Sequence, residues 1–346
     1  METTTQRGKT PKYVTGETTA GGGSVPVIST RLSFRDVVGG VKVRCDIGRM
    51  RYTVPPGLYA VGTPTPESPV LVTANYKLTF DKVRKELTGL SAWLLVLDTK
   101  GINVWCAAGK GTFGTRELER RILAVRLDRV VTHRTVILPQ LGASGVIAHE
   151  VEQASGFRVK YGPVRASDLP AYLAAGMKKT EAMRLVWFRF ADRMAIAPAE
   201  LMHAWPFMIA ALAGSGVFAL PAAVGFIPRF LDLFIPLMGA VIIGAVGFPA
   251  LLPYLPFRAF SLKGAVLGAA WAILAALVVG ASFPVAGVLV LLSTPIVSFI
   301  AMNFTGSSTF TCQPGAALEV RRGIIPMAVT EAAGIGLAVT VRLLAL

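Results

Sequence analysis

The chain has 346 residues, 53% of them hydrophobic, and its mean hydropathy of +0.57 excludes an ordinary soluble enzyme. Its formal net charge of +15 is unevenly divided, because only six basic and three acidic residues occur from Pro206 onward, which leaves +12 on the first 205 residues. A basic, water-exposed first part followed by a membrane part is therefore expected. Nucleic acid is not an expected partner, because the basic part contains no recognisable binding module for it.

The first 60 residues have a weak pattern. Residues 1–30 are polar and rich in Gly and Thr, which predicts a disordered tail without a cleavable signal. The alternating segment Arg31–Ala60, with its Pro55-Pro56-Gly57 turn, predicts an antiparallel prelude to the fold. Cys45 lies within this alternation and is expected in the core.

From residue 69, apolar runs alternate with segments of helical periodicity. This predicts a Rossmann-like α/β domain over residues 31–176, with a mainly parallel sheet covered by helices on both faces. We expect strands at Pro69–Thr73, Trp93–Asp98, Thr135–Pro139 and Phe157–Tyr161, and helices at Leu78–Leu90, Thr115–Val130, Val146–Ala154 and Asp168–Ala175. Ligands of such sheets bind beyond the carboxyl ends of the strands, so Thr73, Asn75 and Asp98 are candidate cofactor-binding residues.

The octet Asn103-Val104-Trp105-Cys106-Ala107-Ala108-Gly109-Lys110 places one cysteine between a predicted strand end and a glycine-rich turn. Cys45 and Cys312 are too distant in sequence to build a zinc or iron–sulfur site with it, because such sites need about four closely spaced ligands. Cys106 is therefore expected to act singly, as a nucleophile, a redox thiol or one axial ligand of a cofactor metal. A nucleophile would need a histidine base, and none of the histidines at positions 133, 149 and 203 has a motif that marks one.

The turn Gly109-Lys110-Gly111-Thr112 is not a nucleotide-hydrolysing phosphate loop. Val104 and Gly111 occupy the two positions at which that fingerprint requires a glycine and a Ser or Thr. The backbone amides and Lys110 are still suited to a phosphate or to the amide-rich rim of a large cofactor.

Residues 177–205 combine apolar side chains at helical spacing with a basic polar side. They predict an amphipathic linker helix that lies along lipid headgroups or, alternatively, packs on the soluble domain. Residues 206–346 predict an all-α transmembrane domain of five helices, at Pro206–Phe226, Phe230–Tyr254, Leu262–Ser282, Pro284–Phe304 and Ile324–Leu343. Loops with Arg258 and Arg321 predict a multi-pass protein of the inner (cytoplasmic) membrane with its sheet domain in the cytoplasm. Glu331 should face other helices and make a structural hydrogen bond.

Two segments carry a family resemblance. Pro69–Tyr76 and Leu97–Trp105 look like the corrinoid-binding domain of the corrinoid iron–sulfur protein of the acetyl-CoA pathway. The octet, joined to a multi-span tail, resembles more specifically the HgcA family, the membrane corrinoid proteins of microbial mercury methylation. The likeness covers residues 52–176 in motif and the remainder in architecture. The four-cysteine cluster domain of the iron–sulfur relative is missing, as is any Asp-x-His-x-x-Gly segment that would supply a histidine to cobalt.

The resemblance implies a cobalamin-type corrinoid cofactor with the Cys106 thiolate as lower axial ligand of its cobalt. It places Asn103, Val104, Trp105, Cys106, Ala107, Ala108, Gly109 and Lys110 in the cofactor pocket. A thiolate is a soft, strongly electron-donating ligand, which suits delivery of a methyl group to an electrophile such as Hg(II). The implied activity is that of a corrinoid-dependent methyltransferase that forms methylmercury.

The implied partners are a ferredoxin-like protein with two 4Fe–4S clusters as electron donor, the Hg(II) substrate, a methyl donor from the methyltetrahydrofolate pathway and the lipid bilayer. Two other functions stay open: a membrane-tethered corrinoid methyl carrier for another acceptor in one-carbon metabolism, and a transporter with a regulatory soluble domain. Cys312, in a predicted cytoplasmic loop, is either incidental or a relay for Hg(II).

Overall fold

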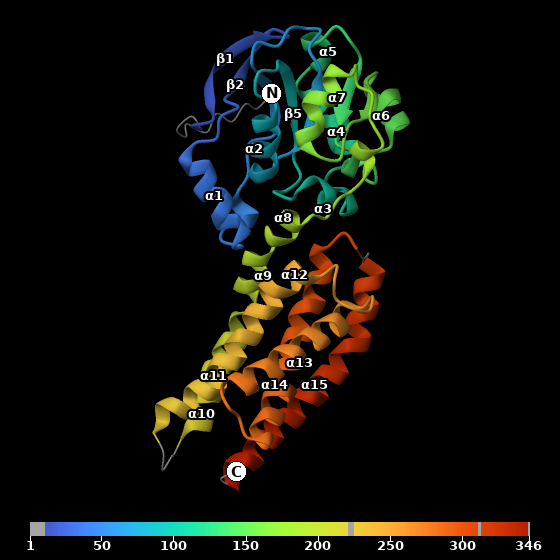
Figure 1. Ribbon diagram of the computed structural model, residues 1–346. Helices are drawn as coiled ribbons and strands as arrows, with labels where there is room; N and C mark the ends of the chain where they lie inside the picture. Colours follow the sequence, from blue (N-terminus) through green and yellow to red (C-terminus); the bar gives the residue numbers. More distant parts are fainter. Residues whose placement is uncertain (1–10, 221–224, 311–312, 345–346) are drawn as a thin grey trace. The chain divides into compact units, whose positions relative to one another are not determined.

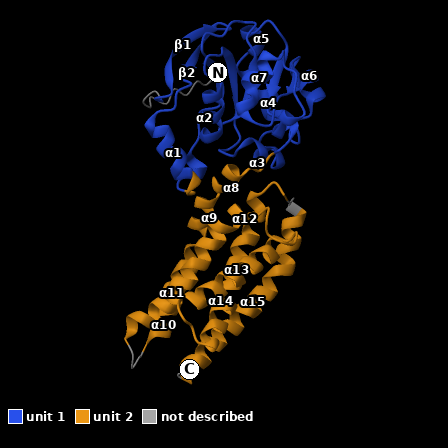
Figure 2. Cartoon of the chain, viewed as in Figure 1, with its two compact units in different colours: residues 1–43, 47–186 blue, residues 44–46, 187–346 orange. Residues whose placement is uncertain are grey.

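The computed structural model describes residues 11–220, 225–310 and 313–344 (Figure 1). The chain divides into two compact units (Figure 2). The sheet unit comprises residues 1–43 and 47–186, and the helical unit comprises residues 44–46 and 187–346. The boundary falls inside the segment 177–205 that the sequence predicted as a linker.

Seven strands form one mixed sheet, in the order β1-β2-β3-β5-β4-β6-β7. Their bounds are β1 Val14–Ala20, β2 Gly23–Ile28, β3 Gly57–Val61, β4 Val70–Ala74, β5 Ala92–Leu97, β6 Thr135–Leu138 and β7 Arg158–Tyr161. The strands expected from residue 69 onward form a parallel group, because β4 pairs in parallel with β5 and β6, and β6 with β7. The mixed character comes from the chain before them, since β1–β2 and β3–β5 are antiparallel.

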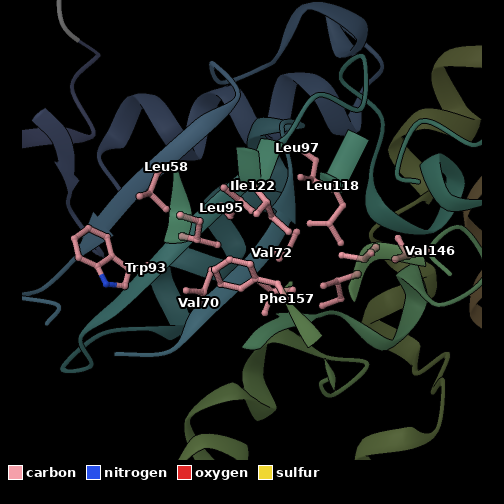
Figure 3. Packing of buried hydrophobic residues seen from close by; sticks show 14 of the residues in the cluster. Leu58, Val70, Val72, Trp93, Leu95, Leu97, Leu118, Ile122, Val146 and Phe157 are labelled. Carbon is pink, nitrogen blue, oxygen red and sulfur yellow. The ribbon is translucent and has the colours of Figure 1, made fainter. Parts of the chain in front are cut away.

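Helices cover both faces of this sheet, as predicted. Val70 and Val72 of β4 face a cluster that includes Leu118 of α4 (Thr115–Ala124) (Figure 3). Leu71, between them, faces the opposite cluster with Phe80 of α2 (Lys77–Glu86). The remaining helices of the sheet unit include α5 Leu127–Val130, α6 Ala148–Ser155 and α7 Leu169–Ala174. Burial on both faces explains why the central strands are continuous apolar runs.

The chain before β3 corrects two predictions. Residues 14–28 are not a disordered tail, because they form the hairpin β1–β2, whose Val25 and Ile28 are buried. The composition was misleading because the glycines at 21 and 22 belong to a tight turn. The segment expected as an antiparallel prelude is antiparallel only at its end, where β3 pairs with β5; before that it contains α1 (Phe34–Arg44), and Cys45 after this helix is half-exposed and outside the core.

A third difference lies after α4. The helix expected over Thr115–Val130 ends at Ala124, and α5 starts at Leu127. Arg126 between them has a φ of 50°, a left-handed conformation that a continuous right-handed helix excludes.

Among its described residues, the helical unit contains four helices long and apolar enough to cross a membrane, or five if one bent pair is a single span. The bent pair joins Phe190–His203 to α10 (Trp205–Ala219), and the long spans are Phe226–Leu251, Phe260–Val278, Phe283–Ser307 and Pro314–Leu343. Within these segments lie α11 Phe226–Ile242, α12 Phe248–Leu251, α13 Phe260–Val278, α14 Phe283–Asn303 and α15 Gln313–Leu343. The prediction of about five apolar helices is therefore confirmed in its coarse form.

Three details of the membrane part differ from the sequence prediction. The linker is not one amphipathic helix, because it is broken into a short turn at Ala182–Arg184, α8 (Phe190–Met194) and α9 (Ala197–His203). Helix α15 begins before the predicted Ile324, so Arg321 lies on a helix and not in a loop. Glu331 is half-buried, and its carboxylate has no hydrogen bond to another described residue. Cys312 lies outside the described residues.

Glycines set the closest helix contact of this unit. A Cβ atom on Gly264 of α13 would lie 2.7 Å from the Ser298 Cα atom of α14, and one on Gly268 would lie 2.9 Å from the Thr294 Cα atom. This small-xxx-small spacing lets two backbones meet, as in membrane helix pairs.

Candidate functional site

Asn75 organises the carboxyl edge of the sheet between β4 and β5. Its side chain is 5% exposed, and its Oδ1 atom accepts hydrogen bonds from the backbone N–H groups of Thr99 and Gly101 at 3.1 and 3.0 Å. The Thr99 hydroxyl lies 2.9 Å from the same atom, and Asn75 Nδ2 donates to Asp98 Oδ1 at 3.1 Å. One amide therefore fixes the first turn of the loop after β5, which is the loop that leads to Cys106.

Gly101 brings this loop close to a neighbouring segment. Its φ is +72°, and a Cβ atom there would lie 2.9 Å from the Thr53 side chain and 3.1 Å from the Met50 carbonyl oxygen. Only glycine satisfies both the left-handed conformation and the close approach. The loop is thus held by the segment with Met50 and Thr53 as well as by Asn75.

Asp98 is held by several hydrogen bonds. Partial burial raises the pKa of Asp98, but hydrogen bonds from the Lys100 ammonium and the Lys100 backbone N–H outweigh it, so the pKa is lowered overall. The Asp98 backbone N–H donates to Glu117 Oε1 at 2.8 Å, and Arg121 Nη2 donates to the same oxygen at 2.7 Å. Burial raises the pKa of Glu117, and these donors reverse that effect and lower it. The first turn of α4 is thereby tied to the end of β5.

The octet forms α3 (Val104–Gly109), a short helix with one buried and one exposed face. Val104, Ala107 and Ala108 are buried in the core cluster beneath the sheet edge. Asn103 caps the helix, because its Oδ1 atom accepts a hydrogen bond from the Cys106 backbone N–H at 2.9 Å. The side chain of Cys106 is exposed and belongs to a free thiol.

The exposed face of α3 combines several chemical groups. Trp105 is 43% exposed, and Cys106, Gly109 and Lys110 are exposed beside it. This face presents an indole, a thiol, a backbone without a side chain and an ammonium group on a helix whose other side is packed. Within the part of the chain that the structure describes, Cys106 has no hydrogen bond to a histidine. His133 lies before β6, with its Nε2 atom 2.9 Å from the Ser68 carbonyl oxygen, at the opposite edge of the sheet.

The loop after β6 supports α3 from the side, and this support was not predicted from the sequence. A Cβ atom on Gly145 would lie 2.2 Å from the Phe113 carbonyl oxygen and 2.9 Å from the Ala108 Cα atom. A Cβ atom on Gly142 would lie 2.5 Å from the Phe113 ring. Two glycines separated by two residues were the available signal, but their contacts are with residues more than 25 positions away, which no local pattern encodes.

The candidate residues thus divide into three groups. Asn75 and Asp98 meet at the strand ends and hold the loop, and the octet forms α3 beside them. Thr73 is 1% exposed, and its hydroxyl has no hydrogen-bond partner among the described residues. The Thr73 side chain is buried on one face of the sheet and does not reach the exposed edge.

The donor set suits a cofactor that needs one protein ligand. Among the described residues there is no group of three or more His, Cys, Asp or Glu that could hold a bare metal ion. A single exposed thiol on a fixed helix can instead supply one axial bond to a metal already held by a macrocycle. The buried Thr112 hydroxyl, directly after the turn, also has no partner within the described ranges. These features fit a corrinoid with a thiolate ligand.

Comparison with known proteins locates a likeness in the same region. Residues 48–173 match the family model of the CO dehydrogenase/acetyl-CoA synthase delta subunit. Acetyl-CoA decarbonylase/synthase complex subunit gamma of Archaeoglobus fulgidus is 33% identical over 122 residues, which are 35% of this chain and 26% of that protein. The subunit gamma of Methanopyrus kandleri is 36% identical over 122 residues, with the same coverage of 35% and 26%. Subunit gamma 2 of Methanosarcina thermophila is 37% identical over 119 residues, 33% of this chain and 25% of that protein.

The chain spans about a quarter of the length of these relatives. The match begins just before β3, includes Asn75, Asp98 and α3, and ends within α7. It leaves out α1 and the whole helical unit. The part of this chain that is similar to subunits of acetyl-CoA decarbonylase/synthase complexes is therefore the part that carries the candidate site.

Proposed function

We propose that the sheet unit binds a cobalamin-type corrinoid and that the chain is a corrinoid-dependent methyltransferase that forms methylmercury from Hg(II). The observation that carries the proposal is the exposed thiol of Cys106 on α3, a capped and packed helix at the carboxyl edge of the sheet. Ligands of parallel sheets bind at this edge. The likeness of residues 48–173 to acetyl-CoA decarbonylase/synthase subunits supports the choice of a one-carbon carrier.

The chain's own residues have separate roles in this proposal. The Cys106 thiolate would ligate the cobalt of the corrinoid, and Asn103 fixes the backbone from which it projects. Trp105, Gly109 and Lys110 lie on the same exposed face and would contact the cofactor. When bound, the corrinoid would supply the methyl group, and a soft, electron-donating thiolate would favour its delivery to an electrophile.

The cellular setting follows from the rest of the chain. With three cysteines in all, the chain cannot ligate the two clusters of an electron donor, so we propose a separate ferredoxin-like partner with two 4Fe–4S clusters. A methyltetrahydrofolate-dependent route supplies the methyl group. We also propose that the chain is a multi-pass protein of the cytoplasmic membrane with its basic sheet unit on the cytoplasmic side, which the apolar helices and the positive charge of the first part support.

A second function is favoured by one observation. The relatives in the comparison are subunits of a complex that handles acetyl-CoA, and nothing in their names refers to mercury. The same site is therefore also suited to a membrane-tethered corrinoid methyl carrier whose acceptor is another molecule of one-carbon metabolism.

The test uses the full chain in nanodiscs, loaded with methylcobalamin. We expect its visible spectrum to differ from that of free methylcobalamin, and addition of Hg(II) to yield methylmercury, measured by mass spectrometry. The Cys106→Ala variant should lose methylmercury formation, whereas the matched Cys45→Ala variant should keep it. Full activity in Cys106→Ala would refute the axial-ligand role. A changed spectrum without methylmercury would favour the carrier function.

A further inference from the structure

Helix α1 turns an apolar face to solvent, which is the reverse of a normal surface helix. At 3.6 residues per turn, Phe34, Val37 and Val41 lie on one side, and their side chains are 82%, 52% and 56% exposed. We call these three residues the outer face of α1. Ile47 and Met50, shortly after the helix, add two more apolar side chains that are 56% and 64% exposed.

The inner side of α1 explains why this face cannot simply turn inward. A Cβ atom on Gly39 would overlap the Tyr52 ring, and one on Gly40 would lie 3.4 Å from Leu78 of α2. The glycines therefore bring the α1 backbone close to its neighbours. Asp36, also on the inner side, pairs with Lys77 at 2.5 Å and with Arg84 at 2.9 Å. Rotation of α1 about its axis would break these ion pairs.

Basic side chains border the outer face. Arg35 and Lys42 lie beside it on the helix and are exposed, and Arg31 precedes it. Arg49 and Arg51 accompany Ile47 and Met50 on the segment that follows. None of these five forms a salt bridge with another residue in the described ranges. Residues 31–51 contain two acidic side chains: Asp36 forms its ion pairs on the inner side, and Asp46, before Ile47, lies 3.1 Å from His203 Nε2, so basic side chains predominate along this surface.

We propose that the outer face of α1 binds the surface of an anionic lipid bilayer. An apolar stripe with basic side chains at its border is the pattern of helices that lie in the headgroup region, where apolar groups enter the acyl boundary and cations contact lipid phosphates. The same chain has helices of membrane-spanning length, and these would tether the sheet unit to a bilayer. A soluble protein partner would need an apolar surface that matches the stripe and acidic groups that match its basic border.

Ion pairs connect α1 to the helix that follows Asn75 of the candidate site. Lys77, which holds Asp36 of α1, is the first residue of α2 and follows Asn75 by two positions. Its backbone N–H donates to the Tyr52 carbonyl oxygen at 2.9 Å. Helix α1 lies before residues 48–173, the range that matches the family model. It gives the sheet unit a lipid contact of its own, in addition to the spans.

The test measures how deeply α1 enters lipid. A full-length chain with alanine at all three cysteine positions receives one nitroxide label, either through Val41→Cys or through the control Lys82→Cys on the exposed side of α2. Accessibility to oxygen and to a water-soluble nickel complex is measured in nanodiscs of phosphatidylcholine, with and without phosphatidylglycerol. Neither corrinoid nor mercury is present, so the result is independent of the proposed methyl transfer.

At position 41 we expect the label to be more accessible to oxygen than to nickel, most strongly with phosphatidylglycerol, and at position 82 to be accessible to nickel in both lipids. The double change Arg35→Glu and Lys42→Glu should return the label at 41 to nickel accessibility. An unchanged mobility of the label at 82 would show that the sheet unit of this variant is folded. Nickel accessibility at 41 in both lipids would overturn the proposal, as would shielding at 41 only when an iron–sulfur protein is added.

Discussion

The strongest structural prediction concerns Asn75, because one buried amide holds the loop that presents Cys106. In Asn75→Ala, the backbone N–H groups of Thr99 and Gly101 lose their acceptor. Each unsatisfied buried donor costs about 1–3 kcal/mol. The Thr99 hydroxyl keeps an alternative acceptor, because it lies 2.6 Å from the Ile102 carbonyl oxygen. The free energy that keeps the loop closed should therefore fall by about 3 kcal/mol.

Hydrogen exchange of the full chain in nanodiscs measures this loss directly. A loss of about 3 kcal/mol corresponds to an increase of about 100-fold in the exchange rate of the peptide that spans residues 98–110. Peptides from β7, at the far side of the sheet, should be unaffected and serve as an internal control. Exchange within a few-fold of the unmodified chain would refute the assignment of the loop to Asn75.

The variant Asn75→Asp separates the hydrogen-bond role from the shape of the side chain. A carboxylate still accepts from Thr99 and Gly101, but it faces the Asp98 carboxylate, to which Asn75 Nδ2 donated. Repulsion between the two raises the pKa of the introduced carboxyl in the folded state above its unfolded value. The stability of the variant should therefore be highest below that unfolded pKa and fall as pH rises. Exchange at residues 98–110 should be faster at pH 8 than at pH 5, relative to the unmodified chain.

Three further predictions test the surroundings of the site. Gly145→Ala should displace α3, because a Cβ atom there would lie 2.2 Å from the Phe113 carbonyl oxygen, and overpacking costs about 1–3 kcal/mol. The variant should retain less corrinoid on gel filtration, and unchanged retention would contradict the close contact. Arg84→Met should destabilise the sheet unit by about 3–5 kcal/mol, because Arg84 is 0% exposed and its loss leaves Asp36 and Asp81 with Lys77 as their shared cation. Urea unfolding followed by tryptophan fluorescence measures the change in the free energy of unfolding. Burial raises the pKa of Asp36, but the hydrogen bonds from Lys77 and Ser33 outweigh burial, so the pKa is lowered overall. The ionised carboxylate therefore stabilises the fold at every pH above the ordinary pKa of an aspartate, and this stabilisation is lost as the pH falls from there through the lowered pKa. Limited proteolysis with pepsin should therefore cut near α1 before the central strands, and simultaneous cleavage would argue against this order.

The central strands were predictable because burial on both faces leaves a direct trace in the sequence. Val70, Leu71 and Val72 read as an apolar run, and the structure shows that the run faces two cores. Asn75 and Asp98 could be placed by the rule that ligands lie at the carboxyl ends of parallel strands. Their hydrogen bond confirms that the two strand ends meet.

The parts that could not be predicted depend on contacts between distant segments. Helix α1 was missed because Gly39 and Gly40, in its middle, are poor helix formers, although Phe34, Val37 and Val41 have helical spacing. The support that Gly145 gives to α3 depends on Phe113, 32 positions earlier, and Glu117 reaches back to the end of β5. Such partners become visible only when the fold has brought the loops together.

The exposure of Cys106 is a property of a rigid element. Its helix is capped by Asn103, packed through Ala107 and Ala108, and entered through a loop that Asn75 holds. This cysteine is exposed although the helix that carries it is capped, packed and entered through a held loop. Exposed thiols are open to oxidation and disulfide exchange, so a free cysteine held at the surface is a chemical liability. Coordination to a bound metal would occupy the sulfur and shield it, which is a reason to expect the cofactor-free chain to be the more easily oxidised form.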